Sequence, residues 1–321
     1  MLLSSIYESV EADLGSVEEG LRSTLKGLFP WLSEMLGYSL SDGGKRIRPA
    51  LMLLCGKFYD YNLEHLQPMG VAIELMHTAT LVHDDAIDKS MVRRGKPTIN
   101  SLWDDERAVL LGDYLFARAG EWATHAQNLY VVRLFSQTLA TISSGELEQI
   151  ISAFNSEQTR EDYLRRISGK TASLFSLATE SGAILSQAPP ELVRILKDYG
   201  HNLGVAFQIV DDILDYVGTE AEIGKPVGSD LTQGTLTLPA MLLMEQYPDN
   251  NPVRRLFRGE DKEQNIALTI KMVRDSGIVE ECYEIAAGYC ARACRDLDQL
   301  PDEVASQPLI KLADFVVRRK N

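Results

Sequence analysis

The stretch HLQPMGVAIELMHTATLVHDDAIDK, residues 65–89, decides the fold class. Its apolar residues recur with the 3.6-residue period of an α-helix rather than with the two-residue period of a strand. Similar stretches fill most of the chain, and no Asn-Gly or Asp-Gly turn separates strand-like runs. We therefore predict an all-α fold of ten or more helices. The predicted helical stretches are 5–28, 47–59, 65–89, 103–124, 128–154, 160–185, 190–216, 236–247, 262–275 and 278–297.

The breaks between these stretches are short and turn-like. They fall at residues 41–44, 188–190, 218–234 and 248–252, and none is long or biased enough to link independent domains. With 45% hydrophobic residues and a mean hydropathy of −0.11, the chain can bury a sizeable core. We expect one domain over residues 1–321.

The overall charge limits the class of partner. A formal net charge of −14 and a pI near 4.9 make nucleic acid a poor partner, because phosphate binding needs a surplus of Lys and Arg. No apolar run approaches the roughly 18 residues of a membrane span, and the N-terminus is too acidic for a leader peptide. The four cysteines, Cys55, Cys282, Cys290 and Cys294, lack metal-site spacing and indicate packing thiols in a reducing compartment. We expect a cytoplasmic protein.

Two acidic triplets with the pattern Asp-Asp-x-x-Asp end apolar helical stretches. The first is Asp84, Asp85 and Asp88, and the second is Asp211, Asp212 and Asp215. The first and last members of each triplet lie about 40° apart around a helix and share one face. A solvated acidic surface is the ordinary interpretation, but the flanks are apolar and Asp is disfavoured near a helix C-terminus. Oxygen ligands without Cys or His favour Mg²⁺, which shares its coordination shell with substrate phosphates.

Basic residues gather around the triplets despite the negative total charge. Arg93, Arg94 and Lys96 follow the first triplet, and GGKRIRP at residues 43–49 precedes it. His77 lies about 20° from Asp84 on the same helical face, and Gln208 is one turn before Asp211. Each feature alone is weak, since a lone histidine is usually a satisfied core residue. Together they predict a phosphorylated substrate.

At this point the motifs resemble those of the trans-isoprenyl diphosphate synthases, also called polyprenyl synthetases. The motifs are GGKRIRP, HTATLVHDDAID, RRGKPT, GKTASLF, FQIVDDILDY and GKPVGSDL, and they occur in the family order. The ending LADFVVRRKN is also similar to the family's C-terminus. The resemblance implies an isoprenoid synthase-like helical bundle around a deep central cavity, with the triplets facing each other across its mouth. It also implies a homodimer.

The resemblance assigns roles by motif position. Three Mg²⁺ ions would bridge Asp84, Asp88 and Asp211, supported by Asp85, Asp212 and Asp215, to the diphosphate of an allylic substrate. The residues expected to hold that diphosphate are Arg93, Lys170, Thr171, Gln208 and Lys225. Those expected to hold isopentenyl diphosphate are Lys45, Arg48, His77 and Arg94. The residues most directly expected in catalysis are Asp84, Asp85, Asp88, Asp211, Lys170 and Lys225.

The implied reaction is ionisation of the allylic C–O bond, attack by the double bond of isopentenyl diphosphate, and loss of a proton. Metal ions and cationic side chains stabilise charge on the leaving diphosphate. No motif here supplies an obvious general base, so the released diphosphate is expected to take the proton. Leu174, Phe175 and Phe207 are candidates for apolar walls that exclude water. The glycine-rich segment 224–234 could close over the site or serve as a surface connection.

Product length is expected to depend on the residues four and five positions before the first aspartate. In this family they set the depth of the cavity, and here they are Thr80 and Ala79, both small. This implies a long product of C30 to C45, with C40 (octaprenyl diphosphate) expected, made from a farnesyl primer for a quinone side chain. Candidates for the cavity floor are Phe116, Trp122, Leu134 and Phe135.

Three other functions are weighed against this one. A geranylgeranyl or farnesyl diphosphate synthase would share the same motifs. A class I terpene cyclase usually has Asn/Asp, Ser/Thr and Glu in its second motif, whereas residues 211–215 read DDILD. A non-catalytic subunit of a heteromeric synthase often loses one aspartate motif, and this chain keeps both.

Overall fold

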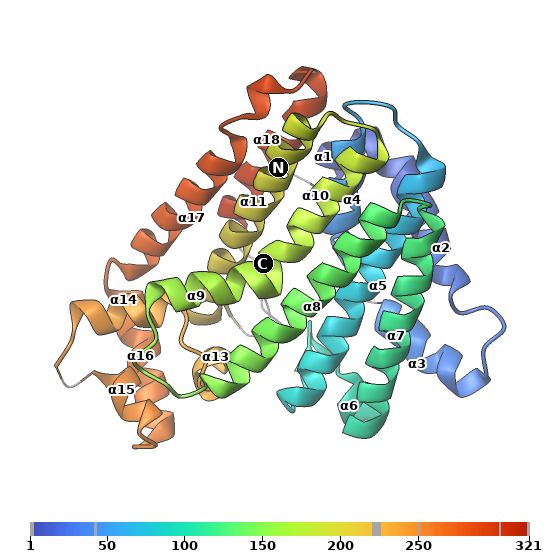
Figure 1. Ribbon diagram of the computed structural model, residues 1–321. Helices are drawn as coiled ribbons and strands as arrows, with labels where there is room; N and C mark the ends of the chain where they lie inside the picture. The colour runs from blue at the N-terminus through green and yellow to red at the C-terminus, as the bar shows by residue number, and fades with distance from the viewer. Residues whose placement is uncertain (1–2, 42–43, 220–225, 250, 302, 320–321) are drawn as a thin grey trace.

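The computed structural model describes residues 3–41, 44–219, 226–249, 251–301 and 303–319, and these are almost entirely helical (Figure 1). The α-helices are α1 Leu3–Tyr7, α2 Glu11–Ser23, α3 Pro30–Leu40, α4 Ile47–Gly56, α5 Leu63–Ile87, α6 Ile99–Leu102, α7 Asp105–His125, α8 Leu129–Ile151, α9 Arg160–Ile167, α10 Ser173–Leu185, α11 Pro190–Val217, α13 Ser229–Thr232, α14 Leu238–Gln246, α15 Pro252–Phe257, α16 Lys262–Asp275, α17 Ile278–Cys294 and α18 Glu303–Arg318. Shorter turns of helix are η1 Glu8–Val10, η2 Ser168–Ala172 and η3 Leu297–Gln299. The predicted all-α fold is confirmed.

The predicted helical stretches agree with the observed helices except in a few places. The sequence analysis missed α3, α18 and the shorter helices α6, α13 and α15. The π-helical turn η2 divides the stretch predicted at 160–185 into α9 and α10, because it interrupts the α-helical hydrogen-bond pattern. Such π-turns are frequent at functional sites because they re-aim side chains within a helix.

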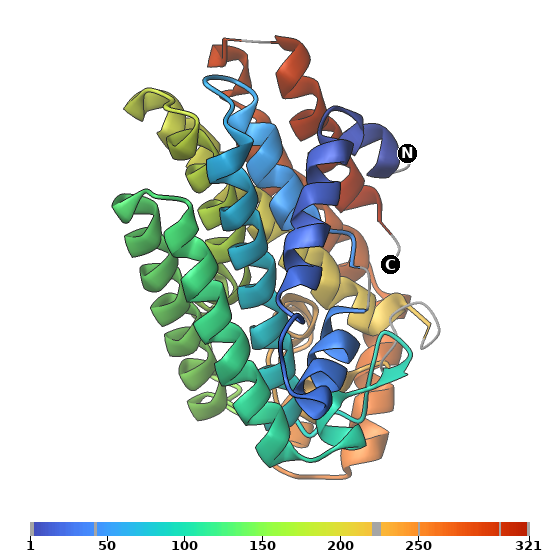
Figure 2. The same cartoon turned by 90° about the vertical axis from the view of Figure 1, so that its right-hand side faces the viewer.

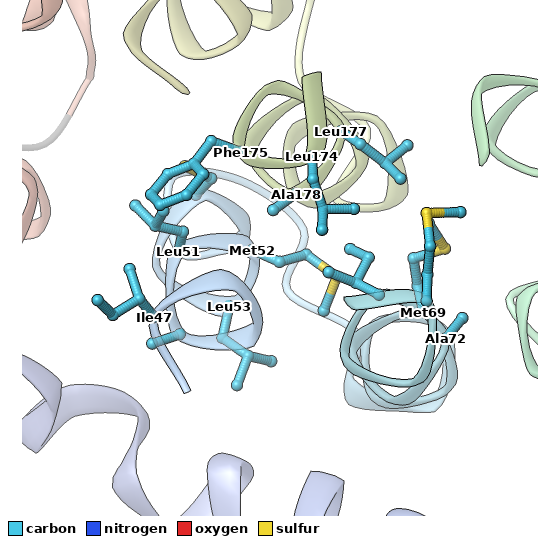
Figure 3. Close-up of a cluster of buried hydrophobic side chains, with 14 of the residues drawn as sticks. Ile47, Leu51, Met52, Leu53, Met69, Ala72, Leu174, Phe175, Leu177 and Ala178 are labelled. Carbon is cyan, nitrogen blue, oxygen red and sulfur yellow. The ribbon is translucent and has the colours of Figure 1, made fainter. Parts of the chain in front are cut away.

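The main core lies where α4, α5 and α10 meet. Figure 3 shows the three helices around this core, with Ile47, Leu51, Met52 and Leu53 on α4 and Met69 and Ala72 on α5. The labelled α10 side chains are Leu174, Phe175, Leu177 and Ala178. Gly182 permits this close approach, because a Cβ atom there would overlap the carbonyl oxygen of Met52. Burial of this apolar surface is the dominant stabilising term.

A second core surrounds the C-terminal half of α11. Ile209 and Ile213 are fully buried there, against side chains of α14, α16 and α17. The N-terminal half of the same helix contributes Leu203 and Ala206 to the first core. Because α11 is shared by both cores, its C-terminal end, which carries the second acidic triplet, is held from several sides.

One feature of the fold is not helical. Strands β1 (Val92–Arg93) and β2 (Lys96–Pro97) form a two-residue hairpin directly after α5. Arg94 and Gly95 make the turn with φ angles of 51° and 74°, the left-handed region that favours glycine. The sequence analysis did not predict this hairpin, because its strands are too short for a period-2 pattern.

Two sequence predictions about the surroundings of the chain can be compared with the fold. Within the described ranges, none of the helices combines the length and apolarity needed to cross a bilayer. All four cysteines are free thiols, and Cys55, Cys282 and Cys290 are buried. They are packing residues, as predicted.

Candidate active site

The first triplet occupies the C-terminal end of α5 and the residue after it. Asp84 and Asp88 are partly accessible, whereas Asp85 is buried. Burial raises the pKa of Asp88, and the neighbouring carboxylates of Asp84 and Asp230 raise it further, while Lys170 opposes them. Asp230 lies beyond the second triplet in the sequence. Its effect on the pKa of Asp88 therefore shows that the two acidic regions lie within electrostatic reach of each other.

Asp85 differs from its two neighbours because it already has a cationic partner. Both of its carboxylate oxygens accept from Nε of Arg93, at 2.8 and 2.9 Å. Burial raises the pKa of Asp85 to about 6, although Arg93 lowers it. The hairpin thus attaches Arg93 to the first triplet. Asp85 holds Arg93 here, and its role as a metal ligand stays a prediction.

Lys170 on η2 lies between two carboxylates. Its Nζ is 3.4 Å from Oδ2 of Asp84 and 2.6 Å from Oε1 of Glu146 on α8. Burial lowers the pKa of Lys170, but Asp84 and Glu146 outweigh burial and raise it. Lys170 is therefore a permanent cation beside the first triplet. Glu146 was not predicted, because in the sequence it is only a polar residue after Gly145 in an otherwise ordinary helix.

Thr171, the residue next to Lys170, connects η2 to the second triplet. Its hydroxyl donates to Oε1 of Gln208 at 2.6 Å, and Nε2 of Gln208 donates to Oδ1 of Asp212 at 2.8 Å. Tyr163 donates to the other oxygen of Asp212 at 2.7 Å. Burial raises the pKa of Asp212, which these neutral donors partly offset. The π-helical turn η2 therefore contacts the first triplet through Lys170 and reaches the second through Thr171 and Gln208.

Asp215 is buried and serves the loop after α11. Ser229 donates to one of its oxygens at 2.9 Å, and the backbone N–H of Asp230 donates to the other at 3.1 Å. Its own carbonyl accepts from Gly228 N–H at 2.9 Å. Asp212 and Asp215 thus accept hydrogen bonds within the protein, and their role as metal ligands stays a prediction. The described part of the glycine-rich segment packs against the second triplet, while Lys225 lies outside the described residues.

Asp211 is the most accessible member of the second triplet, and it forms an ion pair with a side chain near the C-terminus. Arg319, just after α18, places one guanidinium nitrogen 2.5 Å from Oδ1 of Asp211 and donates to the carbonyl of Phe207 at 2.7 Å. The same guanidinium stacks on the Phe207 ring, with its carbon 3.7 Å from the ring centroid. A buried arginine that pairs with a carboxylate acts as its counter-charge. The sequence analysis did not identify Arg319.

The remaining carboxylates fit divalent-ion chemistry. Asp84, Asp88 and Asp211 offer hard oxygen donors, and the cations beside Asp84 and Asp211 show that both need neutralising charge. Within the part of the chain that the structure describes, no three Asp, Glu, His or Cys side chains form a preformed metal site. Mg²⁺ takes one or two carboxylates and completes its shell with water and substrate phosphates.

The residues predicted to bind isopentenyl diphosphate form a second cationic group. Burial, followed by Arg48 and then Arg94, lowers the pKa of His77 well below its usual value. Burial also lowers the pKa of Arg48 to about 10, and Nε of Arg48 has no hydrogen-bond partner in the described structure. Burial and the nearby Arg319 lower the pKa of Lys45. Lys45, Arg48 and Arg94 thus lie within electrostatic reach of one another, with Glu74 and Asp211 as nearby counter-charges.

Arg46 fixes the loop that carries Lys45 and Arg48. It adopts a left-handed conformation with φ of 48° at the start of α4 and forms ion pairs with Glu18 of α2 and Glu74 of α5. The Nη1 atom of Arg46 is 2.7 Å from Oε1 of Glu74. Because Arg46 points into this buried pair, it is a support of the loop rather than part of the anion site. The motif GGKRIRP gave no sign of this division.

A small cavity of about 60 Å³ lies among these residues. His77, Arg93 and Arg94 line it, together with Gly44, whose missing Cβ leaves room for the Arg94 guanidinium. The structure therefore brings residues predicted for both substrates to one cavity. Arg94 reaches it from the left-handed turn of the hairpin.

The residues predicted to control product length lie one to two turns before Asp84 on α5. Thr80 is half-buried and lies about 40° from Asp84 around the helix, whereas Ala79 is fully buried and about 140° away. Of the apolar wall candidates, Phe175 and Phe207 contact each other with ring centroids 5.1 Å apart, and Arg48 covers Phe175. Trp122, a candidate for the cavity floor, lies near Gly20 of α2, and its role as the floor stays a prediction.

Comparison with known proteins agrees with this arrangement of helices and charges. The profile of the family described as polyprenyl synthetase matches residues 29–273. The heptaprenyl diphosphate synthase component 2 of Bacillus subtilis is 37% identical, covering 100% of this chain and 92% of that protein. A decaprenyl diphosphate synthase from Rhodobacter capsulatus has a TM-score of 0.92 at 37% identity, covering 100% of both chains. A polyprenyl synthase from Caulobacter crescentus CB15, complexed with calcium and isoprenyl diphosphate, has a TM-score of 0.95 at 31% identity, covering 100% of this chain and 98% of that one.

An all-α bundle with two acidic helix ends and a cationic group between them defines an enzyme that acts on diphosphates. The chain belongs to the polyprenyl synthetase family. The predicted enzyme class, a prenyltransferase, is confirmed by that membership.

Proposed function

We propose that this protein is a long-chain all-trans polyprenyl diphosphate synthase, which adds isopentenyl diphosphate repeatedly to an allylic diphosphate. The observation that carries the proposal is the position of η2. Lys170 contacts Asp84 of the first triplet, and Thr171 reaches Asp212 of the second through Gln208. A diphosphate placed between the triplets would meet Asp84, Asp88, Lys170 and Arg93 on the side of the first triplet and Asp211 on the side of the second.

The side chains divide the reaction between two anion sites. Mg²⁺ at Asp84, Asp88 and Asp211 would supply Lewis-acid stabilisation of the leaving diphosphate. Lys170 and Arg93 add fixed positive charge where negative charge develops. Lys45, Arg48, His77 and Arg94 would orient isopentenyl diphosphate, with His77 neutral and able to donate one N–H. The calcium and isoprenyl diphosphate bound by the Caulobacter relative support a divalent-ion site of this kind.

Removal of the final proton is assigned to the released diphosphate. Among the described residues at this site, His77 is surrounded by arginines and Glu146 is paired with Lys170, so neither is placed as a free base. Phe175 and Phe207 form part of an apolar wall beside the cationic group and would keep water from the allylic cation.

The expected product is about C40, an octaprenyl diphosphate made from a farnesyl primer and used as a quinone side chain. The support is the small size of Thr80 and Ala79 and the names of the relatives, which are a heptaprenyl and a decaprenyl synthase. A geranylgeranyl or farnesyl diphosphate synthase is the nearest alternative. We further propose that residues 1–321 act as one cytoplasmic domain.

The test is incubation with Mg²⁺, labelled isopentenyl diphosphate and geranyl, farnesyl or geranylgeranyl diphosphate, followed by reverse-phase sizing of the products. We expect chains of C30 to C45. In Thr80→Phe a phenyl ring would lie one turn below Asp84 and shorten the product by several isoprene units. Ala79→Phe should also shorten it, with an added stability loss of about 1–3 kcal/mol because Ala79 is fully buried.

Three results would argue against this proposal. A wild-type product of C15 or C20 would support the short-chain alternative. An unchanged product in both variants would contradict the role of Thr80 and Ala79 in chain length. The absence of any condensation product under all primers would contradict catalysis by this chain alone.

We propose a homodimer formed through the exposed face of α7 and α8. The two helices lie side by side at one edge of the molecule (Figure 2) and expose several large apolar side chains. These are Val109, Leu110, Leu129, Leu147, Ile150 and Ile151. Exposed large apolar side chains of this kind mark an interaction surface.

A second assembly must be tested against the homodimer, because one relative is named as component 2 of its synthase. Light scattering on the purified chain should give twice the mass of 35.7 kDa, and Leu147→Glu with Ile151→Glu should give the single mass. A wild-type chain that is monomeric and inactive would instead indicate the need for a second polypeptide.

A further inference from the structure

Glu146 lies beside the candidate active site but belongs to neither acidic triplet. It is on α8, and its side chain is partly buried, with 17% exposure. At the neighbouring Gly145, a Cβ atom would be 3.7 Å from the backbone nitrogen of Lys170, so α8 and η2 are in van der Waals contact. The carboxylate of Glu146 is therefore carried by a rigid helix directly beside Lys170.

The two carboxylates around Lys170 are not equidistant. Oε1 of Glu146 is 2.6 Å from the ammonium nitrogen, whereas Oδ2 of Asp84 is 3.4 Å away. Asp84 is a proposed metal ligand, and a close lysine would compete with a metal ion for its oxygens. Glu146 lies on α8, and it holds the Lys170 ammonium at this longer distance from Asp84.

We infer that Glu146 is a positioning residue that holds the Lys170 ammonium against α8 and so leaves Asp84 available to the metal–diphosphate complex. This inference rests on the proposed function, because it concerns the same site. Without the Glu146 charge, the flexible lysine side chain would move toward Asp84 and Asp88, the nearest remaining anions. The cost would fall on metal binding rather than on the fold.

An ordinary structural ion pair makes a different prediction. A partly exposed pair contributes about 0–1 kcal/mol to stability and has no effect on ligand affinity. The same helix provides a control, since Glu148 pairs with Arg165 at 2.6 Å, away from both triplets. Replacing Glu148 should therefore change thermal stability slightly and leave metal binding as it was.

The experiment compares Glu146→Gln with Glu148→Gln, using titration calorimetry with Mg²⁺ in the presence of inorganic diphosphate. The Gln side chain keeps the size of Glu and removes its charge. We expect the Mg²⁺ concentration at half saturation to rise about tenfold in Glu146→Gln, equivalent to about 1.4 kcal/mol, and to stay unchanged in Glu148→Gln. Circular dichroism would confirm that both variants fold.

A double variant separates competition from other causes. If the freed lysine is what weakens metal binding, then Glu146→Gln should have no further effect in a Lys170→Met background. Equal Mg²⁺ midpoints for wild type and Glu146→Gln would overturn the inference, and so would an undiminished Glu146→Gln effect in that background. Failure of the proposed function would appear separately, as the absence of condensation products from the wild-type chain.

Discussion

The two acidic triplets have the same sequence pattern but different surroundings. In the first, the middle carboxylate is paired with Arg93, and the outer two, Asp84 and Asp88, remain partly accessible. In the second, Asp212 and Asp215 are buried among neutral donors, and only Asp211 is accessible. We propose that the first triplet offers two ligands to a substrate complex, whereas the second offers one and uses the other two to hold the fold.

The largest expected effect is the loss of an accessible carboxylate from either side. Asp84→Ala and Asp211→Ala should each lower turnover by about 100- to 1,000-fold, because each removes charge needed around the leaving diphosphate. Product formation from labelled isopentenyl diphosphate measures this, and a retained helical circular dichroism spectrum excludes unfolding. Near-normal activity in either variant would refute the assignment of metal ligands.

The third positions of the triplets should separate catalysis from stability. Asp88→Asn is expected to lower turnover by about 10- to 100-fold with little change in the melting temperature. Asp215→Asn should instead destabilise the protein by about 1–3 kcal/mol, since buried donors at Ser229 and Asp230 lose their charged acceptor. Denaturant unfolding and initial rates on both variants measure the comparison. Equal patterns in the two variants would show that the triplets are equivalent after all.

The neutral donors of the second triplet can be tested through Tyr163. Tyr163→Phe leaves one oxygen of the buried Asp212 without its partner and should cost about 1–2 kcal/mol of unfolding free energy. Tyr216→Phe is the matched control, because Tyr216 is buried on α11, the helix that carries Asp212, and its hydroxyl is 3.4 Å from Thr237. Activity should fall less than tenfold in Tyr163→Phe. A loss of activity well above tenfold, with the unfolding free energy lowered no more than expected, would place Asp212 among the metal ligands.

A further expected effect is a pH dependence of stability from the first triplet. The pKa of Asp85 is raised from 3.8 to about 6, so the folded protein binds its proton more tightly than the unfolded chain does. The resulting stabilisation is present below pH 4 and is lost as the pH rises through 6. Relative to Asp85→Asn, metal-free wild-type protein should lose up to about 2–3 kcal/mol over this range. Urea unfolding in chelator at pH 4, 5, 6 and 7 measures it, and a pH-independent difference would contradict the shift.

Much of the fold and the outline of the site could be predicted from sequence. The long helices have clear periodicity, and the charges of the triplets and of GGKRIRP stand out against apolar flanks. The identical patterns gave no means of distinguishing Asp85 from Asp212, because their difference comes from Arg93 on a hairpin and Tyr163 on α9. Sequence spacing reports which residues share a helical face, but it does not report which partners the fold brings to them.

The supporting residues were missed for the same reason. Glu146, Arg319 and the pair Glu18 and Glu74 are single charges on ordinary helices, far in sequence from the residues they contact. Their only local signals were weak, such as the arginines in the ending LADFVVRRKN. Long-range packing selects them, and no local pattern encodes that packing.

The contacts of Arg46 and Asp211 bear on where the functional unit begins and ends. The family profile covers residues 29–273, but Glu18 pairs with Arg46 from before that range and Arg319 pairs with Asp211 from after it. A chain trimmed to residues 29–273 would keep the six internal motifs and still lose the partners of Arg46 and Asp211. Fusion partners or protease cleavage at either terminus are therefore expected to act on the chemistry itself.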